Sequence, residues 1–227
     1  MKEGTALTII DAQRCFMPAL EGQRLGVEGF GELPVEGGEL IVPNLNNLTH
    51  EFRRRMLPVA TTQDWHPEVT AHFADEPNYV DTWPKHGRAD TPGAELHPEL
   101  YVTYINNTIP HFKKGMEAAT SPADDTSYTG ALAVDLKTGT TLPEWLEQKQ
   151  VTHVVLGGLA LGDGKDNPLC VDSTALDLRR LGYEVTVVTD AVEAVLPENR
   201  QKCFTNLGAV GVRLATTNEV IGQLAEV

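Results

Sequence analysis

The sequence predicts an α/β fold built on a parallel sheet, in a single domain that spans residues 1–227. Short apolar runs alternate with longer segments in which apolar residues recur every three or four positions. Apolar residues make up 41% of the chain and charged residues 22%, which is ordinary globular composition. A chain of 227 residues can bury a generous core in one domain.

Each predicted element follows from its pattern. Apolar runs rich in β-branched residues predict strands, at 6–10, 56–62, 104–109, 153–158, 184–189 and 211–216. Amphipathic segments predict the helices that cover the sheet, at 37–54, 141–150, 170–183 and 197–211. The strand–helix rhythm favours parallel pairing of successive strands.

Two long segments interrupt this rhythm, residues 63–103 and residues 113–139. The first is rich in Pro, His, Asp and Gly, and the second in Gly, Ser, Thr and Asp. Long connections in a compact domain are usually functional loops. Both leave the carboxyl end of a predicted strand, where open α/β sheets form their sites. We therefore expect the functional site at this edge.

Charge and cysteine usage exclude several classes of protein. The formal charge of -14 would repel nucleic acid and anionic membrane surfaces, so neither is expected as a partner. The apolar run before Asp11 is too short for a signal peptide, and no window approaches a membrane span. Cys15, Cys170 and Cys203 are widely spaced, which favours free thiols in a reducing compartment. We expect a soluble, cytoplasmic protein.

The first long loop contains a candidate metal site. Side chains two apart in an extended chain point the same way, so Asp64 and His66 can face one ion. His72 follows shortly, and the segment "WPKHG" supplies His86. A carboxylate with imidazoles suits zinc, iron or manganese, and the ligand types favour zinc. The alternative is a solvated loop with scattered histidines, and the spacing alone does not separate the two.

Cys170 is a candidate nucleophile at the start of the predicted helix 170–183. Unpaired backbone N–H groups and the helix dipole favour a thiolate at this position. A thiol that ionises readily can attack a carbonyl carbon. The alternative is a cysteine packed under a loop as a small apolar residue.

Asp11 and Lys114 are candidate partners of Cys170. Asp11 closes the first predicted strand, where partial desolvation suits a carboxylate to proton transfer. Its alternative role is a turn or helix cap. Lys114 follows the third predicted strand and can stabilise a thiolate, although a loop lysine is commonly just solvated. Asp11, Lys114 and Cys170 are all expected at one edge of the sheet. A shared catalytic site therefore explains their placement better than three unrelated structural roles.

With these residues assembled, the sequence resembles the nicotinamidase/pyrazinamidase family of isochorismatase-like cysteine hydrolases over most of its length. The segment "DAQRCFMP" is similar to the family's opening motif, which implies a catalytic aspartate at Asp11 and a pocket aromatic at Phe16. The segment "KKG" implies the catalytic lysine at Lys114, and "CVDSTALDLRRLGYEVTVVTDAVEAV" implies the nucleophile at Cys170.

The resemblance extends to the metal loop. The segments "DWHPEVTAHF" and "WPKHGRADTPGAELHP" are similar to the family's metal-binding region. They imply Asp64, His66 and His86 as ligands of one divalent metal ion, with His72 as a fourth ligand. The same similarity implies Trp83 as a wall that stacks on the substrate ring.

The resemblance implies a fold, an activity and a substrate. The fold is a three-layer α/β/α arrangement, with a six-stranded parallel sheet of Rossmann-like type. The activity is hydrolysis of nicotinamide to nicotinate and ammonia in NAD salvage, with pyrazinamide as a second substrate. The partner is thus a small carboxamide, and the sequence leaves a homo-oligomer open.

The segment between Ala160 and Cys170 departs from the family pattern. The family has a shorter link here, whereas this chain carries "LGDGKDNPL", expected as an exposed bulge or a mobile flap. The resemblance implies an oxyanion hole from the backbone N–H groups of Cys170 and a residue near Ala160, which often follows a cis peptide. Because the insertion lies between Ala160 and Cys170, it bears directly on the assignment of Ala160 to the oxyanion hole.

Three other functions fit the same residues. One is a related cysteine amidase that acts on another small carboxamide. A second is a catalytically inactive homologue that binds a ligand. The third is a metal-dependent hydrolase in which Cys170 takes no part.

Overall fold

One seven-stranded sheet runs through the molecule, as given by a computed structural model that describes residues 4–105, 108–122, 126–165 and 167–225. The strand order is β4-β3-β2-β1-β5-β6-β7. Six of these strands run parallel, and β4 pairs antiparallel at one edge. The strands are β1 (Thr5–Ile10), β2 (Val59–Asp64), β3 (His111–Lys114), β4 (Val134–Asp135), β5 (His153–Leu161), β6 (Glu184–Ala194) and β7 (Arg213–Ala215).

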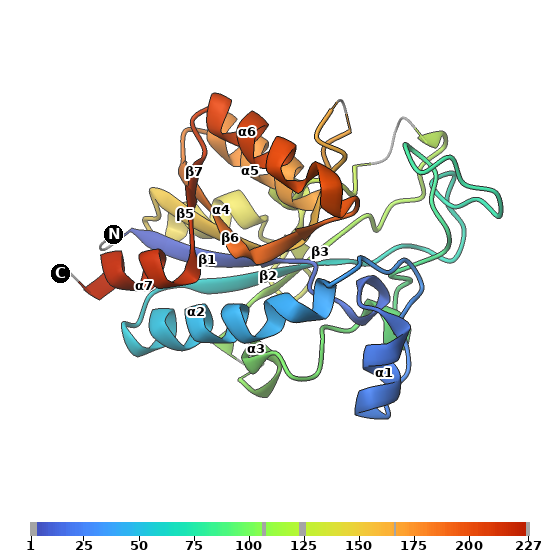
Figure 1. Cartoon of the computed structure of the whole chain (residues 1–227), viewed down its shortest axis with the longest axis horizontal. Coiled ribbons are helices and arrows are strands. Elements are labelled where there is room, and N and C mark those ends of the chain that lie inside the picture. Colours follow the sequence, from blue (N-terminus) through green and yellow to red (C-terminus); the bar gives the residue numbers. More distant parts are fainter. Residues whose placement is uncertain (1–3, 106–107, 123–125, 166, 226–227) are drawn as a thin grey trace.

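Helices cover both faces of the sheet (Figure 1). Helices α2, α3 and α7 lie on one face, and α4, α5 and α6 on the other. Their bounds are α1 (Ala19–Leu25), α2 (Val42–Arg54), α3 (Tyr101–Tyr104), α4 (Leu142–Gln148), α5 (Cys170–Arg180), α6 (Arg200–Ala209) and α7 (Thr217–Ala225). Short 3-10 helices are η1 (Arg14–Phe16), η2 (Gly38–Ile41), η3 (Pro92–Ala94), η6 (Gly130–Leu132) and η7 (Pro197–Asn199).

The central strands are buried because both faces of the sheet are covered. Every residue of β1 and of β2 is buried, as expected of parallel strands between two helix layers. The two apolar cores lie on opposite faces. One packs α2 and α7 against the sheet, and the other packs α4, α5 and α6. This rigid frame holds the carboxyl ends of β1, β2, β3 and β5 at one edge.

The predicted three-layer α/β/α architecture is confirmed, and the strand count is one higher than expected. The extra strand is β4, a two-residue antiparallel edge strand too short to produce a sequence pattern. The strand predicted at 104–109 is wrong. Tyr104 ends α3 and Ile109 precedes the strand that begins at His111, while residues 106 and 107 lie outside the described residues. Pro110, which has no backbone N–H to donate to a neighbouring strand, directly precedes this strand.

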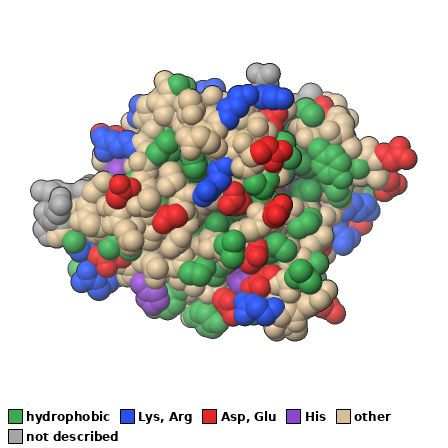
Figure 2. Space-filling model, viewed as in Figure 1, with side chains coloured by type: hydrophobic (Ala, Val, Ile, Leu, Met, Phe, Trp, Pro, Cys, Tyr) green, Lys and Arg blue, Asp and Glu red, His purple; other side chains and the backbone are tan. Residues whose placement is uncertain are grey.

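Three of the described helices, α1, α3 and α7, were not predicted from the sequence. Helix α1 and helix α7 are short, and α1 is mostly exposed apart from Gly22. None of the described helices is long and apolar enough to cross a bilayer. Figure 2 shows acidic and basic side chains interspersed over one face of the molecule.

Candidate active site

Asp11, Lys114 and Cys170 meet at the carboxyl edge of the sheet. Asp11 directly follows β1, Lys114 ends β3 and Cys170 begins α5. Nζ of Lys114 lies 2.8 Å from Oδ2 of Asp11 and 3.4 Å from Sγ of Cys170. The other oxygen of Asp11 accepts a 2.6 Å hydrogen bond from Oγ1 of Thr62. A carboxylate, an ammonium and a thiol are therefore in contact, with Asp11 and Lys114 buried.

Burial sets the protonation of this cluster. It raises the pKa of the Asp11 carboxyl, and Lys114 opposes that shift only in part. Burial alone would lower the pKa of Lys114, but attraction to Asp11 and Asp64 outweighs it and raises that pKa well above its usual value. Burial also raises the pKa of the Cys170 thiol well above its usual value, although Lys114 opposes it. Cys170 at rest is thus a thiol that needs a base, rather than a thiolate stabilised by the helix terminus.

The residues Asp64, His66, His72 and His86 form a second buried cluster beside the first. One nitrogen of each histidine lies within 4.8 Å of those of the others. Nε2 of His66 and Nε2 of His86 lie 3.8 Å and 3.9 Å from Oδ2 of Asp64. Two donors that are each about 2.1 Å from one zinc ion can lie at most about 4.2 Å apart. The two spacings from Asp64 lie below this limit, so Asp64 can share an ion with His66 and with His86.

The protonation of this second cluster also fits a divalent metal ion. Nε2 of His66 is buried and has no hydrogen-bond partner among the described residues, an arrangement that is costly unless the atom binds something. Nδ1 of His86 donates to the carbonyl oxygen of Pro84 at 2.7 Å, which leaves Nε2 as the ligand atom. Burial lowers the pKa of His86 to about 3. Burial alone would raise the pKa of Asp64, but Lys114, His66 and His86 together outweigh it and lower that pKa, so the carboxylate stays ionised.

Gln13 fixes the position of Asp64. Its side-chain oxygen accepts from the backbone N–H of Asp64 at 2.8 Å, and its Nε2 donates to the carbonyl of Asp64 at 2.9 Å. Nε2 also donates to the carbonyl of Ala94 at 2.9 Å. Because Gln13 is buried, these bonds are shielded from water. They hold the end of β2 as a neighbouring strand would.

Glycine is required where the second long loop passes the metal cluster. Gly115 has a φ of 68°, and a Cβ there would lie 2.6 Å from Cε1 of His66. Any other residue would combine the cost of a left-handed backbone with a clash against a candidate ligand. The backbone that follows Lys114 can thus pass this close to the His66 ring only because residue 115 is glycine.

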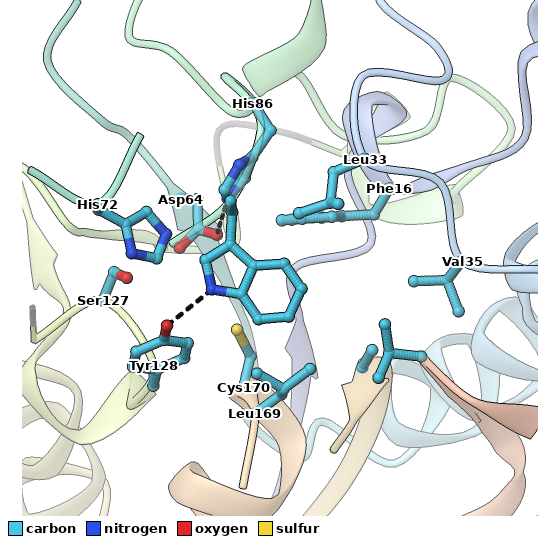
Figure 3. Close-up of a pocket in the computed structure, with 13 residues that line it drawn as sticks. Phe16, Leu33, Val35, Asp64, His72, His86, Ser127, Tyr128, Leu169 and Cys170 are labelled. Carbon is cyan, nitrogen blue, oxygen red and sulfur yellow. Dashed lines mark hydrogen bonds and ion pairs between the residues drawn. The ribbon is translucent and has the colours of Figure 1, made fainter. Parts of the chain in front are cut away.

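A pocket opens onto both clusters (Figure 3). It encloses about 450 Å³, counted out to the solvent at its mouth. Asp64, His72, His86 and Cys170 contribute to its floor and walls, and the ring centroids of Phe16 and His86 lie 5.4 Å apart. The remaining walls come from Leu33, Val35, Trp83, Ser127, Tyr128, Ala160, Leu169 and Val195.

The structure brings all the sequence-predicted site residues to this pocket region. Phe16, Trp83, Ala160 and Cys170 all line it. The peptide bond between Leu159 and Ala160 is cis.

Sequence reasoning missed the apolar wall residues Leu33, Val35, Leu169 and Val195. It also missed four polar residues of the site, namely Gln13, Thr62, Ser127 and Tyr128. Tyr128 accepts a 2.8 Å hydrogen bond from Nε1 of Trp83, shown as a dashed line in Figure 3. The carbonyl of Ser127 accepts from Nζ of Lys114. The only signal for these last two residues is the unusual length of the loop that carries them.

The chain matches known proteins across nearly its full length. The model of the isochorismatase domain matches residues 5–219. A nicotinamidase/pyrazinamidase of Mycobacterium tuberculosis is 30% identical, over 94% of this chain and 99% of that protein. The structure of a Pyrococcus horikoshii pyrazinamidase in complex with zinc has a TM-score of 0.72 and 29% identity, over 94% and 99% of the two chains. A protein of L. infantum in complex with nicotinate has a TM-score of 0.72 and 26% identity, over 95% and 94%.

Proposed function

The chain belongs to the isochorismatase family and is a hydrolase that acts on a carboxamide, and from that premise we propose that it converts nicotinamide to nicotinate and ammonia. The reaction uses Cys170 as nucleophile and requires a divalent metal ion. One observation carries the proposal: the thiol cluster and the imidazole cluster open into a single pocket. The substrate class follows that of the matched nicotinamidases and pyrazinamidases.

The metal cluster supplies a site for orienting the substrate. Asp64, His66, His72 and His86 would hold a divalent ion, which would supply Lewis acidity for orienting the substrate ring. Phe16 and Trp83 offer apolar ring faces that exclude water and position the ring. The carboxamide is then presented to Cys170. Zinc is the ion favoured by the ligand set and by the zinc-bound relative, with iron and manganese as the competing ions.

Asp11 moves the proton in both halves of the reaction. It takes the proton from Sγ of Cys170, and the sulfur attacks the amide carbon. Backbone N–H groups of Ala160 and Cys170 stabilise the oxyanion that forms. Asp11 then gives the proton to the departing nitrogen, so that ammonia leaves and a thioester remains. The same carboxylate activates water, which hydrolyses the thioester and releases nicotinate.

Lys114 allows the carboxylates of Asp11 and Asp64 to have different roles. Its ammonium contacts Asp11, Asp64 and Cys170 at once. It therefore stabilises negative charge wherever that charge lies during the proton transfer. Since Asp64 remains ionised, it can serve as a metal ligand while Asp11 exchanges the proton.

A substrate panel tests the proposed function. Ammonia release is measured from nicotinamide, pyrazinamide and benzamide by the zinc-loaded protein. We expect the highest kcat/KM for nicotinamide, a measurable value for pyrazinamide and a large loss for benzamide, because benzamide lacks the ring nitrogen. Cleavage of benzamide as fast as of nicotinamide would contradict the orienting role of the metal site. Cleavage of an unrelated amide alone would contradict the substrate.

A further inference from the structure

The side chain of Asp172 binds both ends of the loop that links β5 to α5. Its Oδ2 atom accepts a hydrogen bond from the backbone N–H of Gly162 at 2.5 Å and another from that of Leu169 at 3.3 Å. Gly162 is the first residue after β5, and Leu169 immediately precedes α5. The carboxylate therefore ties together the two ends of loop 162–169.

These two ends adjoin Ala160 and Cys170, whose backbone N–H groups stabilise the oxyanion in the proposed reaction. Ala160 lies two residues before Gly162, at a point where the pairing of β5 with β6 shifts register between Leu159 and Leu161. Cys170 directly follows Leu169. Ala160, Leu169 and Cys170 all line the pocket. The separation between the N–H groups of Ala160 and Cys170 thus depends on how the ends of the loop are held.

Other contacts among the described residues hold the body of the loop and its Gly162 end. The carbonyl oxygen of Gly162 accepts from Sγ of Cys203 at 3.3 Å, and the backbone N–H of Asp163 donates to the carbonyl oxygen of Asn167 at 3.4 Å. Asp163 accepts from the backbone N–H of Lys165 at 2.7 Å and from Nδ2 of Asn167 at 3.0 Å. Nδ2 of Asn206 on α6 donates to the carbonyl of Gly164 at 3.1 Å. The described part of the insertion therefore forms a turn held against α6, with Lys165 and Pro168 exposed.

On the basis of the proposed amide hydrolysis, we propose that Asp172 is a positioning residue that holds the backbone N–H groups of Ala160 and Cys170 in place for the oxyanion. Asp172 is buried and does not line the pocket, so it acts through the backbone it binds. Burial raises its pKa to about 6, against the opposing effect of the two N–H donors. A short link between β5 and α5 would by itself restrict how far apart Ala160 and Cys170 can move. In this chain the link is longer, and the side chain of Asp172 supplies that restraint.

Steady-state kinetics on nicotinamide test the role. For Asp172→Ala we expect kcat to fall about tenfold or more, because oxyanion donors act in the transition state. KM should change less than about twofold, since the ring is held elsewhere. Asp172→Asn keeps an acceptor oxygen, so its kcat should be closer to that of the wild type than to that of Asp172→Ala. Asp163→Ala is the matched control, expected within about twofold of wild-type kcat because it removes only contacts inside the loop.

Hydrogen exchange of the backbone amides tests the same role without turnover. The amides of Gly162 and Leu169 should exchange faster in Asp172→Ala than in the wild type, and remain protected in Asp172→Asn and Asp163→Ala. Unchanged protection, or wild-type kcat in a folded Asp172→Ala protein, would overturn the inference. Failure of the wild type to cleave any amide would instead contradict the proposed function, and the exchange result would still decide the role of Asp172.

Discussion

The ammonium of Lys114 lies 2.8 Å from a carboxylate oxygen of Asp11, and both side chains are buried. The same ammonium contacts Asp64, its register partner on β2. One cation therefore joins the base of the thiol cluster to the carboxylate of the metal cluster. Removing that cation would leave two buried carboxylates without their shared counter-charge, which is costly in a low-dielectric interior.

Lys114→Ala should therefore weaken folding as well as abolish turnover. We expect the free energy of unfolding to fall by about 3–5 kcal/mol, the usual cost of breaking a buried ion pair. Lys113→Ala is a matched control on the neighbouring residue. Nζ of Lys113 donates to Oε1 of Gln63 at 2.7 Å and lies 3.7 Å from the centroid of the Trp65 ring, so about 1 kcal/mol is expected. Urea unfolding measures both variants, and equal losses would contradict the special position of Lys114.

Gly115→Ala should reduce metal binding. A Cβ at this position would meet the His66 ring at 2.6 Å, so the candidate ligand must move. Gly139→Ala is the control, since Gly139 has a φ of 72° and nothing within 4 Å of its added Cβ. Both variants incur a similar backbone cost of about 1 kcal/mol. Bound zinc per chain, measured after dialysis, should fall only in Gly115→Ala, and an unchanged zinc content there would show that His66 is not a ligand.

Tyr128→Phe should weaken substrate binding more than it slows the chemical step. The change removes the oxygen that accepts from Nε1 of Trp83, and the indole then loses the partner that orients it. A lost hydrogen bond of about 1 kcal/mol corresponds to a rise of about fivefold in KM. Tyr104→Phe, at an exposed residue of α3, serves as the control. A fall in kcat at unchanged KM would place Tyr128 in the chemical step instead.

The stability of the protein should carry a pH dependence from Asp172. Its folded-state pKa of about 6 lies above the ordinary value of 3.8, because burial outweighs the hydrogen bonds from Gly162 and Leu169, and Asp163 adds to the shift. The folded chain then binds more protons than the unfolded chain in this window, so this group destabilises the fold as pH rises from about 4 to about 6. Asp172→Asn removes the effect.

The measurement is the free energy of unfolding of the wild type and of Asp172→Asn between pH 4 and pH 8. The free energy of unfolding of Asp172→Asn, relative to that of the wild type, should rise by on the order of 1–3 kcal/mol between about pH 4 and about pH 6. Above about pH 6 this difference should stay constant. A difference that stays constant with pH would contradict the raised pKa.

The convergence of the site residues can be predicted from the sequence, because the fold brings the carboxyl ends of the parallel strands to one edge. Asp11, Asp64 and Cys170 each adjoin an apolar run or helix with a clear period, and parallel strands bring their carboxyl ends to one edge. Lys114 is placed correctly at that edge even though the predicted strand before it is wrong. The register that pairs Lys114 with Asp64 could not be predicted, since it depends on where β3 begins.

Other features depend on tertiary contacts that leave no local pattern. Gln13 binds the backbone of Asp64, 51 residues away in the chain, and nothing in its sequence neighbourhood indicates that partner. Tyr128 reaches Trp83 from a long loop with no periodicity. The closure of the inserted loop by Asp172 is likewise invisible in the sequence, because an aspartate near a helix start is an ordinary capping residue.

Ammonia release from nicotinamide tests the central claim most directly, measured with wild type and Cys170→Ala, each stripped of metal and then resupplied with zinc, iron or manganese. The account predicts turnover only when the thiol and a metal ion are both present. Turnover by Cys170→Ala in the presence of metal would contradict the role of the nucleophile. Full turnover by the metal-free wild type would contradict the role of the imidazole cluster.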